Sequence, residues 1–144
     1  MKALVVDDEN EAREAACQVL KKLGFDVKAA EGGVEGVEMA HAWMPDIIFA
    51  DNYMPVVGGL AVCKIIASDK ATAHIPVMVL STNSAESNML LAMSRGGGVI
   101  GKPLTAKRVQ SAIESIDALR SKWEQVELGK LVPRGKKREP ARRL

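Results

Sequence analysis

The sequence is poor in cysteine and histidine and has no long apolar run. Cys17 and Cys63 are its only cysteines, and each lies among the apolar residues of a predicted helix. We therefore expect reduced cysteines in the core of a cytoplasmic protein, and neither a disulfide nor a metal site built on them. No apolar run reaches the roughly 18 residues of a membrane-spanning helix. The first residues lead directly into a strand pattern instead of a signal peptide, so no membrane partner is expected.

The charge of the chain is concentrated at one end. Residues 129–144 contain seven Lys or Arg and one Glu and carry +6, whereas residues 1–128 carry −4. The basic end has Pro and Gly but no apolar periodicity, and we expect it to be disordered. Its residues 131–135, LVPRG, match the thrombin site of expression vectors, which favours a vector remnant. If the stretch is native, it could contact RNA, DNA or an acidic surface, but direct nucleic-acid binding is not expected.

Strand and helix patterns alternate along the rest of the chain. Short apolar runs predict buried strands, and apolar residues at three- and four-residue spacing predict helices between them. The strands are expected at residues 3–6, 25–30, 47–50, 77–80 and 99–100, and the helices at residues 12–23, 32–44, 60–67, 84–93 and after Thr105, which is expected to cap the last helix. This order predicts an α/β domain at residues 1–122. We expect a doubly wound, five-stranded parallel sheet of flavodoxin-like order 2-1-3-4-5 with helices on both faces.

Polar residues follow four of these strands at the point where each ends. Asp7 and Asp8 follow the first strand and Asp51 follows the third, while Ser81 and Lys102 end the fourth and fifth. Because the carboxyl ends of parallel strands meet at one edge of a sheet, we expect these side chains to lie together. Three carboxylates there would repel one another by roughly 1 to 4 kcal/mol per pair, so the cluster needs a cation. Oxygen ligands without His or Cys favour Mg²⁺.

The same residues suit the transfer of a phosphoryl group. The ammonium of Lys102 and the hydroxyl of Ser81 can bind phosphoryl oxygens, and Asp51 is a candidate nucleophile toward phosphorus. Each residue taken alone allows another interpretation. Asp7 and Asp8 could cap the first helix, Asp51 could form a turn, Ser81 could merely end a strand, and Lys102 could be solvated. Their coincidence at one edge of the sheet favours the phosphoryl site.

Four sequence motifs support a more specific interpretation. They are the acidic motif at residues 5–9, the motif that begins with Asp51 at residues 51–55, the strand at residues 75–81 and the pair Lys102-Pro103. In this order and spacing they resemble the receiver domain of two-component response regulators of the chemotaxis-regulator type, over residues 2–122. The resemblance implies that a histidine kinase or phosphotransfer protein donates a phosphoryl group to Asp51, with Mg²⁺, and that phosphorylation changes the affinity for a downstream protein. It implies no enzyme beyond catalysis of its own phosphorylation and dephosphorylation.

The resemblance also assigns the metal ligands. Asp8, Asp51 and the main-chain carbonyl of Tyr53 would hold Mg²⁺, while Asp7 would act through a metal-bound water. The side chains of Tyr53 and Asn83 would flank the path of an attacking water and so set the lifetime of the phosphorylated state.

The sequence departs from the family at the switch, the residues whose side chains change conformation in the family on phosphorylation. Ser81 matches the switch hydroxyl and Lys102 the invariant lysine, whose bond to Pro103 is cis in the family. The next switch position usually carries Tyr or Phe, but here it is Val99, whose β-branched side chain cannot swing as a ring does. We therefore expect the loop at residues 96–98 and the helix before it to report phosphorylation instead.

The last helix carries more apolar residues than the domain should need. They follow the alternating three- and four-residue steps of a heptad pattern, at Val109, Ala112, Ile116, Leu119, Trp123 and Val126. The core is expected to use only the first half of this helix, with residues 123–128 as an extension. Trp123 and Val126 must then either fold over the domain or pair with a second helix, which allows a homodimer.

Two other functions fit part of the pattern. A phosphatase of the haloacid-dehalogenase type also uses a strand-end Asp as its nucleophile. It carries a second Asp two residues later, however, where this chain has Tyr53, and the chain has no cap domain. The other alternative is a binding module with the receiver fold that does not depend on phosphorylation. The intact acidic cluster argues against that module, and Val99 argues for it.

Overall fold

The computed structural model describes residues 1–82, 98–116, 119, 123 and 124. In this part of the chain, five strands form one parallel sheet in the order β2-β1-β3-β4-β5. The strands are β1 (Lys2–Val6), β2 (Asp26–Ala30), β3 (Ile47–Asp51), β4 (Val77–Ser81) and β5 (Gly98–Gly101). The predicted strand order and parallel pairing are therefore confirmed.

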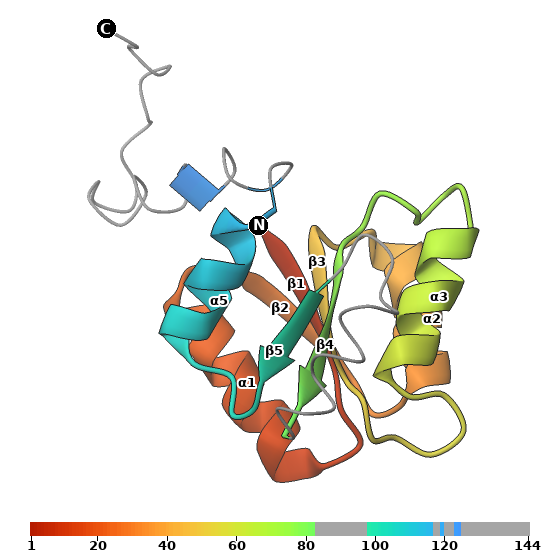
Figure 1. Cartoon of the computed structure of the whole chain (residues 1–144), viewed down its shortest axis with the longest axis horizontal. Helices are drawn as coiled ribbons and strands as arrows, with labels where there is room; N and C mark the ends of the chain where they lie inside the picture. The colour runs from red at the N-terminus through yellow and green to blue at the C-terminus, as the bar shows by residue number, and fades with distance from the viewer. Residues whose placement is uncertain (83–97, 117–118, 120–122, 125–144) are drawn as a thin grey trace, which may run out of the picture.

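Helices cover both faces of this sheet (Figure 1). Helices α1 (Asn10–Lys22) and α5 (Ala106–Glu114) pack on one face, and α2 (Gly33–Trp43) and α3 (Gly59–Ser68) pack on the other. The helix predicted at residues 84–93 and the loop at residues 96–97 lie outside the described residues.

Strand β3 is buried on both sides because its side chains alternate between two cores. Ile47 and Phe49 pack in the core beneath α1 and α5, whereas Ile48 and Ala50 pack in the core beneath α2 and α3. Full burial of one large apolar side chain contributes about 1.5 to 3 kcal/mol, and a shift by one residue would exchange the two sets. The two cores therefore fix the register of β3 and the position of Asp51 at its end.

Turn and cap residues set the ends of the helices. Gly24 follows α1 with φ 96, a left-handed conformation in which glycine is unstrained. At the other end of the chain, Thr105 caps α5 as predicted, since its side-chain oxygen accepts the main-chain N–H of Arg108 at 3.2 Å. The first turn of α5 is thereby fixed just after the loop that carries Lys102.

The apolar core extends beyond the first half of the last helix. Leu119 and Trp123 are buried at 4% and 3% exposure in the core beneath α1 and α5. The ring of Trp123 stacks on that of Phe25 with 5.8 Å between centroids. Trp123 thus folds over the domain, the first of the two arrangements considered, because Phe25 offers it an apolar surface. Val126 lies outside the described residues, and a homodimer through this helix stays a prediction.

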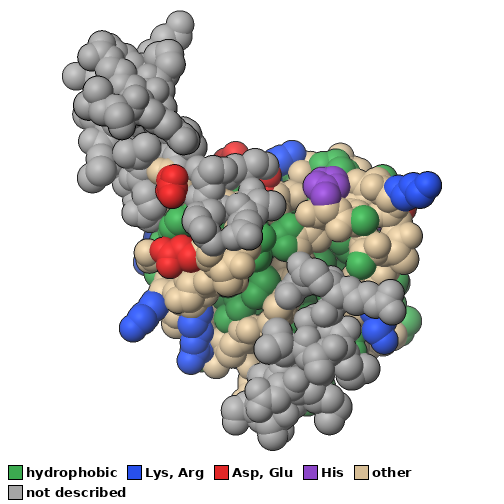
Figure 2. All heavy atoms as spheres, turned by 45° about the horizontal axis from the view of Figure 1, so that its top comes forward, with side chains coloured by type: hydrophobic (Ala, Val, Ile, Leu, Met, Phe, Trp, Pro, Cys, Tyr) green, Lys and Arg blue, Asp and Glu red, His purple; other side chains and the backbone are tan. Residues whose placement is uncertain are grey.

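The surface of the described residues mixes apolar and charged side chains. Figure 2 shows apolar side chains reaching the surface in the middle of one face, with Lys, Arg, Asp and Glu side chains around them. Neither cysteine forms a disulfide; Cys63 is buried and Cys17 is partly buried. Among the described residues, the helices are too short or too polar to cross a membrane.

Candidate phosphoryl-transfer site

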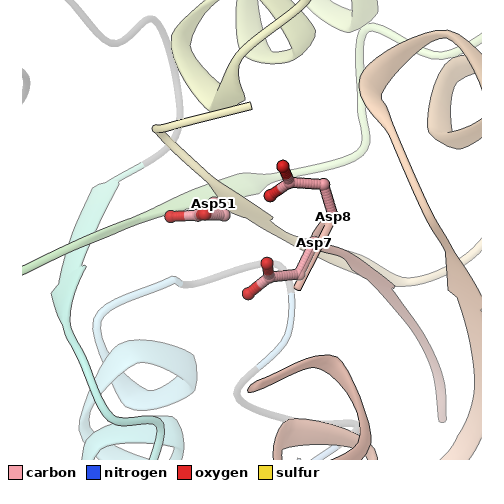
Figure 3. A group of neighbouring side chains, drawn as sticks. All are labelled: Asp7, Asp8 and Asp51. Atoms are coloured by element: carbon pink, nitrogen blue, oxygen red, sulfur yellow. The ribbon is translucent and has the colours of Figure 1, made fainter. Parts of the chain in front are cut away.

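Three carboxylates meet at the carboxyl edge of the sheet. Asp7 and Asp8 directly follow β1 and Asp51 is the last residue of β3, so the parallel pairing of these strands places them side by side. One carboxylate oxygen of each residue lies within 4.8 Å of the others. Figure 3 shows the side chains of Asp7 and Asp8 reaching toward Asp51. Asp7 and Asp51 are 1% and 6% exposed, whereas Asp8 is exposed to solvent.

The backbone of Asp7 is held from both sides. Its N–H donates to the carbonyl of Ala30 at 3.1 Å, and its own carbonyl accepts Nη1 of Arg13 at 2.9 Å. Its side-chain Oδ1 accepts the N–H of Glu9 at 3.0 Å. Glu9, not Asp7, is the N-cap residue of α1, and the side chain of Glu9 makes no capping hydrogen bond. Simple helix capping therefore does not account for this acidic pair.

Lys102 brings an ammonium group to the carboxylates. Its Nζ lies 3.2 Å from Oδ2 of Asp7 and 3.4 Å from Oδ1 of Asp51. Its main-chain N–H donates to the carbonyl of Ser81 at 2.8 Å, which joins the ends of β4 and β5. The Lys102–Pro103 bond is cis, as the sequence resemblance implied.

The electrostatics of the site favour an additional cation. Burial, and then the nearby charge of Asp7, raises the pKa of Asp51 above its ordinary value, although Lys102 and the N–H of Tyr53 act in the opposite direction. For Lys102, burial alone would lower the pKa, but the carboxylates of Asp51 and Asp7 outweigh it and raise the pKa. One ammonium thus faces three carboxylates. The cluster keeps a net negative charge when all these groups are ionised.

The donor set fits a hard divalent cation. The neighbouring ligand atoms are carboxylate oxygens, and no His or Cys belongs to this cluster of described residues. Mg²⁺ prefers oxygen ligands and accepts one or two carboxylates together with waters. The partial exposure of Asp8 leaves one side of the cluster open to such waters.

The loop after β3 is shaped by close backbone contacts. A Cβ on Gly59 would lie 2.7 Å from the carbonyl oxygen of Ala50, and a Cβ on Gly33 would clash with the carbonyl oxygen of Val57. The amino end of α2 therefore packs directly on this loop. Val56, which is 97% exposed, has φ 67. This left-handed backbone conformation costs of order 1–3 kcal/mol for a β-branched residue. The ends of the loop, not the preference of Val56, impose this shape.

The remaining predicted residues lie on β4, on β5, in the loop after β3 or outside the described residues. Ser81 ends β4, is 1% exposed, and follows Leu80, the partner of Asp51 in the sheet register. Tyr53 lies in the loop after β3 with its side chain 58% exposed. Val99 lies on β5 and packs against the core beneath α2 and α3. Asn83 lies outside the described residues.

A small cavity borders the site. It has a volume of about 290 Å³ and lies between α1 and the loop after β5. Asp7 and Lys102 line its polar side, and Ala12, Ala16 and Leu104 line its apolar side. A larger hollow of about 560 Å³ runs along β5 and α5 and does not include the carboxylates. Of the three carboxylates, Asp7 borders the smaller of the two.

Two arginines near the site were not identified from the sequence. Arg13 binds the carbonyl of Asp7, and Arg108 binds the carbonyls of Gly101 and Pro103 on both sides of Lys102. Both contacts are made by long side chains to main-chain oxygens. No spacing rule in the sequence signals such contacts.

Comparison with known proteins agrees with this geometry. Residues 3–114 match the response regulator receiver domain family. The chemotaxis protein CheY4 of Vibrio cholerae is 25% identical with a TM-score of 0.71, over 80% of this chain and 97% of that one. A response regulator from Desulfuromonas acetoxidans is 28% identical with a TM-score of 0.69, over 83% and 98% of the two chains.

A third solved structure shares the fold at lower identity. It is the receiver domain of the sensor histidine kinase PA1611 from Pseudomonas aeruginosa, described with a magnesium ion coordinated in its active site cleft. It is 20% identical with a TM-score of 0.70, over 80% of this chain and 95% of that one. The fold, the acidic cluster and the match over most of the chain lead to one conclusion: this protein belongs to the response regulator receiver domain family of two-component signalling.

Proposed function

We propose that this receiver domain accepts a phosphoryl group on Asp51 from the phosphohistidine of a histidine kinase or phosphotransfer protein. The observation that supports this most is the convergence at Asp51. Two further carboxylates lie within 4.8 Å of it, and the ammonium of Lys102 lies 3.4 Å away. Such a site combines an anionic nucleophile with groups that stabilise charge on a phosphoryl group.

The reaction needs only one bond exchange. An oxygen of Asp51 attacks phosphorus as the P–N bond of the donor breaks. The electron pair of that bond stays on the imidazole nitrogen, which takes up a proton from solvent. Lys102 and the hydroxyl of Ser81 bind the phosphoryl oxygens and stabilise their charge. The raised pKa of Lys102 keeps its ammonium protonated for this role.

The acidic residues hold Mg²⁺ in this proposal. Asp8, Asp51 and the main-chain carbonyl of Tyr53 would bind the ion directly, and Asp7 would act through a metal-bound water. When bound, Mg²⁺ would supply positive charge to neutralise the charge that the phosphoryl group brings to the cluster. The oxygen-only donor set supports this assignment, as does the magnesium described in the receiver of PA1611.

Phosphorylation then changes the affinity for a downstream protein. Ser81 moves toward the phosphoryl oxygens, and Val99, on the strand beside β4, takes the place of the usual aromatic residue. The side chain of Tyr53, 58% exposed in the loop after Asp51, borders the path of the hydrolytic water. We place this activity in the cytoplasm, where histidine kinases present their phosphohistidine.

Labelling with a small phosphodonor tests the proposal. Acetyl phosphate with MgCl₂ should add one phosphoryl group to the wild type, as read by intact-mass spectrometry, and EDTA should prevent it. The Asp51→Asn variant should not be labelled. Absence of the adduct on the wild type would remove the proposed function. Continued turnover of a free phosphomonoester would instead support the haloacid-dehalogenase alternative.

A further inference from the structure

A single guanidinium group binds the backbone on both sides of Lys102. Nη1 of Arg108, in the first turn of α5, donates to the carbonyl of Gly101 at 3.1 Å and to the carbonyl of Pro103 at 2.7 Å. These two residues immediately flank Lys102. The second contact is at the short end of the range for charge-assisted hydrogen bonds.

Other contacts hold this segment together with Arg108. The N–H of Lys102 donates to the carbonyl of Ser81 at 2.8 Å, which fixes one side of the peptide chain to β4. Arg108 itself is anchored through its main-chain N–H, which donates to the hydroxyl of Thr105. Its guanidinium lies beside Gly101, where a Cβ would be 3.7 to 3.9 Å from three of its atoms. These are ordinary van der Waals separations, so the guanidinium lies directly against the chain at Gly101.

We propose that Arg108 is a positioning residue for Lys102 in phosphoryl transfer. This inference rests on the proposed function. Lys102 has a flexible four-carbon stem, so the place of its ammonium depends on how firmly its backbone is held. Arg108 fixes the two carbonyls that flank that backbone and thereby keeps Nζ between Asp7 and Asp51. It does not touch the carboxylates in any contact described above and acts through Lys102.

The structure separates this role from a general stabilising role. Arg108 and both acceptor residues are exposed, so water can replace the hydrogen bonds if the guanidinium is removed. Global stability should then change little. The proposed metal ligands lie at the ends of β1 and β3 and not on β5 or α5, so Mg²⁺ affinity should not change either. The rate of phosphoryl transfer should change, because misplacement of a catalytic group by about 1 Å can cost up to about 100-fold.

The experiment compares Arg108→Gln with Lys107→Gln, which removes the same charge one residue earlier. With acetyl phosphate and saturating MgCl₂, Arg108→Gln should slow labelling of Asp51 about tenfold, and Lys107→Gln by less than about twofold. The Mg²⁺ Kd should stay within about twofold in both. Arg108→Lys, which keeps a cationic donor, should recover part of the rate. A change in Mg²⁺ affinity equal to the change in rate would overturn the proposal.

A double-mutant cycle tests whether the effect passes through Lys102. In a Lys102→Gln background, Arg108→Gln should slow labelling no further, since the group that it positions is gone. Additive effects of the two substitutions would overturn the proposal.

Hydrogen exchange provides a readout that does not depend on labelling. The Lys102 amide, which donates to Ser81, should exchange faster in Arg108→Gln and at the wild-type rate in Lys107→Gln. If the wild type is never labelled but the Lys102 amide still exchanges faster in Arg108→Gln, the proposed function is refuted and the positioning of Lys102 by Arg108 stands. Normal labelling with unchanged rate and exchange in Arg108→Gln would refute the positioning role alone.

Discussion

Replacing Asp51 with Asn should make the metal-free protein more stable. The carboxylate of Asp51 lies within 4.8 Å of those of Asp7 and Asp8, which corresponds to a repulsion of about 1 to 3.5 kcal/mol per pair at effective dielectric constants of roughly 80 to 20. The ammonium of Lys102 at 3.4 Å offsets about one such pair. The raised pKa of Asp51 means that burial and the remaining repulsion outweigh this attraction. We expect a net gain of order 1 kcal/mol, or about 4 °C in Tm.

The sign of this effect follows from the pKa of Asp51. Folding raises that pKa above its ordinary value of 3.8. The favourable contribution is therefore complete below pH 3.8 and is lost as the pH rises through the pKa of the folded state. At neutral pH the ionised carboxylate costs stability, and asparagine removes this cost.

Urea unfolding in EDTA, followed by Trp fluorescence, measures the difference. Asp26→Asn, at the exposed start of β2 on the opposite edge of the sheet, is the control and should change stability by less than about 0.5 kcal/mol. With MgCl₂ at about 100 times its Kd, the wild type should gain about 2.7 kcal/mol and become the more stable protein. A metal-free Asp51→Asn variant less stable than the wild type would refute the reasoning.

Three further substitutions test other parts of the structure. Trp123→Ala removes a buried ring and should cost about 3 to 5 kcal/mol in urea unfolding; a cost below about 1 kcal/mol would contradict its place in the core. His41 and Asp69 form a hydrogen bond, which raises the pKa of His41 above 6.5 and lowers the pKa of Asp69 below 3.8. The pair therefore stabilises the fold mainly between pH 3.8 and pH 6.5, and the contribution of the histidine is lost as the pH rises through its pKa in the folded state. His41→Gln should therefore lower the urea midpoint more at about pH 5 than at about pH 9, and equal shifts would count against the pair. Gly33→Ala drives a methyl group into the loop after β3, which should lower the free energy of unfolding by about 1–3 kcal/mol and weaken Mg²⁺ binding in calorimetry. Gly32→Ala, whose Cβ would have nothing within 4 Å, should change neither stability nor Mg²⁺ binding. The same Mg²⁺ Kd in both variants would refute the role of the contact between Gly33 and this loop.

The ends of the strands were predictable because two local signals agree there. In β3, a run of apolar residues predicts a strand buried on both faces, and the polar residue that follows marks its end. Parallel pairing then brings Asp51 beside Asp7 and Asp8 without any knowledge of side-chain contacts. The cap at Thr105 was predictable for a similar reason, since capping is a contact between near neighbours in sequence.

Contacts made by long side chains could not be predicted in the same way. Arg13 and Arg108 each reach main-chain carbonyls, a contact that depends on rotamers and on the path of a loop. Trp123 was expected either to cover the domain or to pair with another helix, because its helix has an apolar seam that suits both. Only the position of Phe25, almost a hundred residues earlier in sequence, decides that the ring stacks on the domain itself.

The most direct test of the proposed site is a crystal structure of the protein grown with MgCl₂ and beryllofluoride, a mimic of the phosphoryl group. We expect beryllofluoride bonded to a carboxylate oxygen of Asp51, and Mg²⁺ bound by Asp8, Asp51 and the carbonyl of Tyr53. Nζ of Lys102 should lie within hydrogen-bonding distance of a fluorine. A structure with Asp51 unmodified, or with Lys102 turned away from a modified Asp51, would contradict the proposal that this carboxylate accepts the phosphoryl group at a site built by its neighbours.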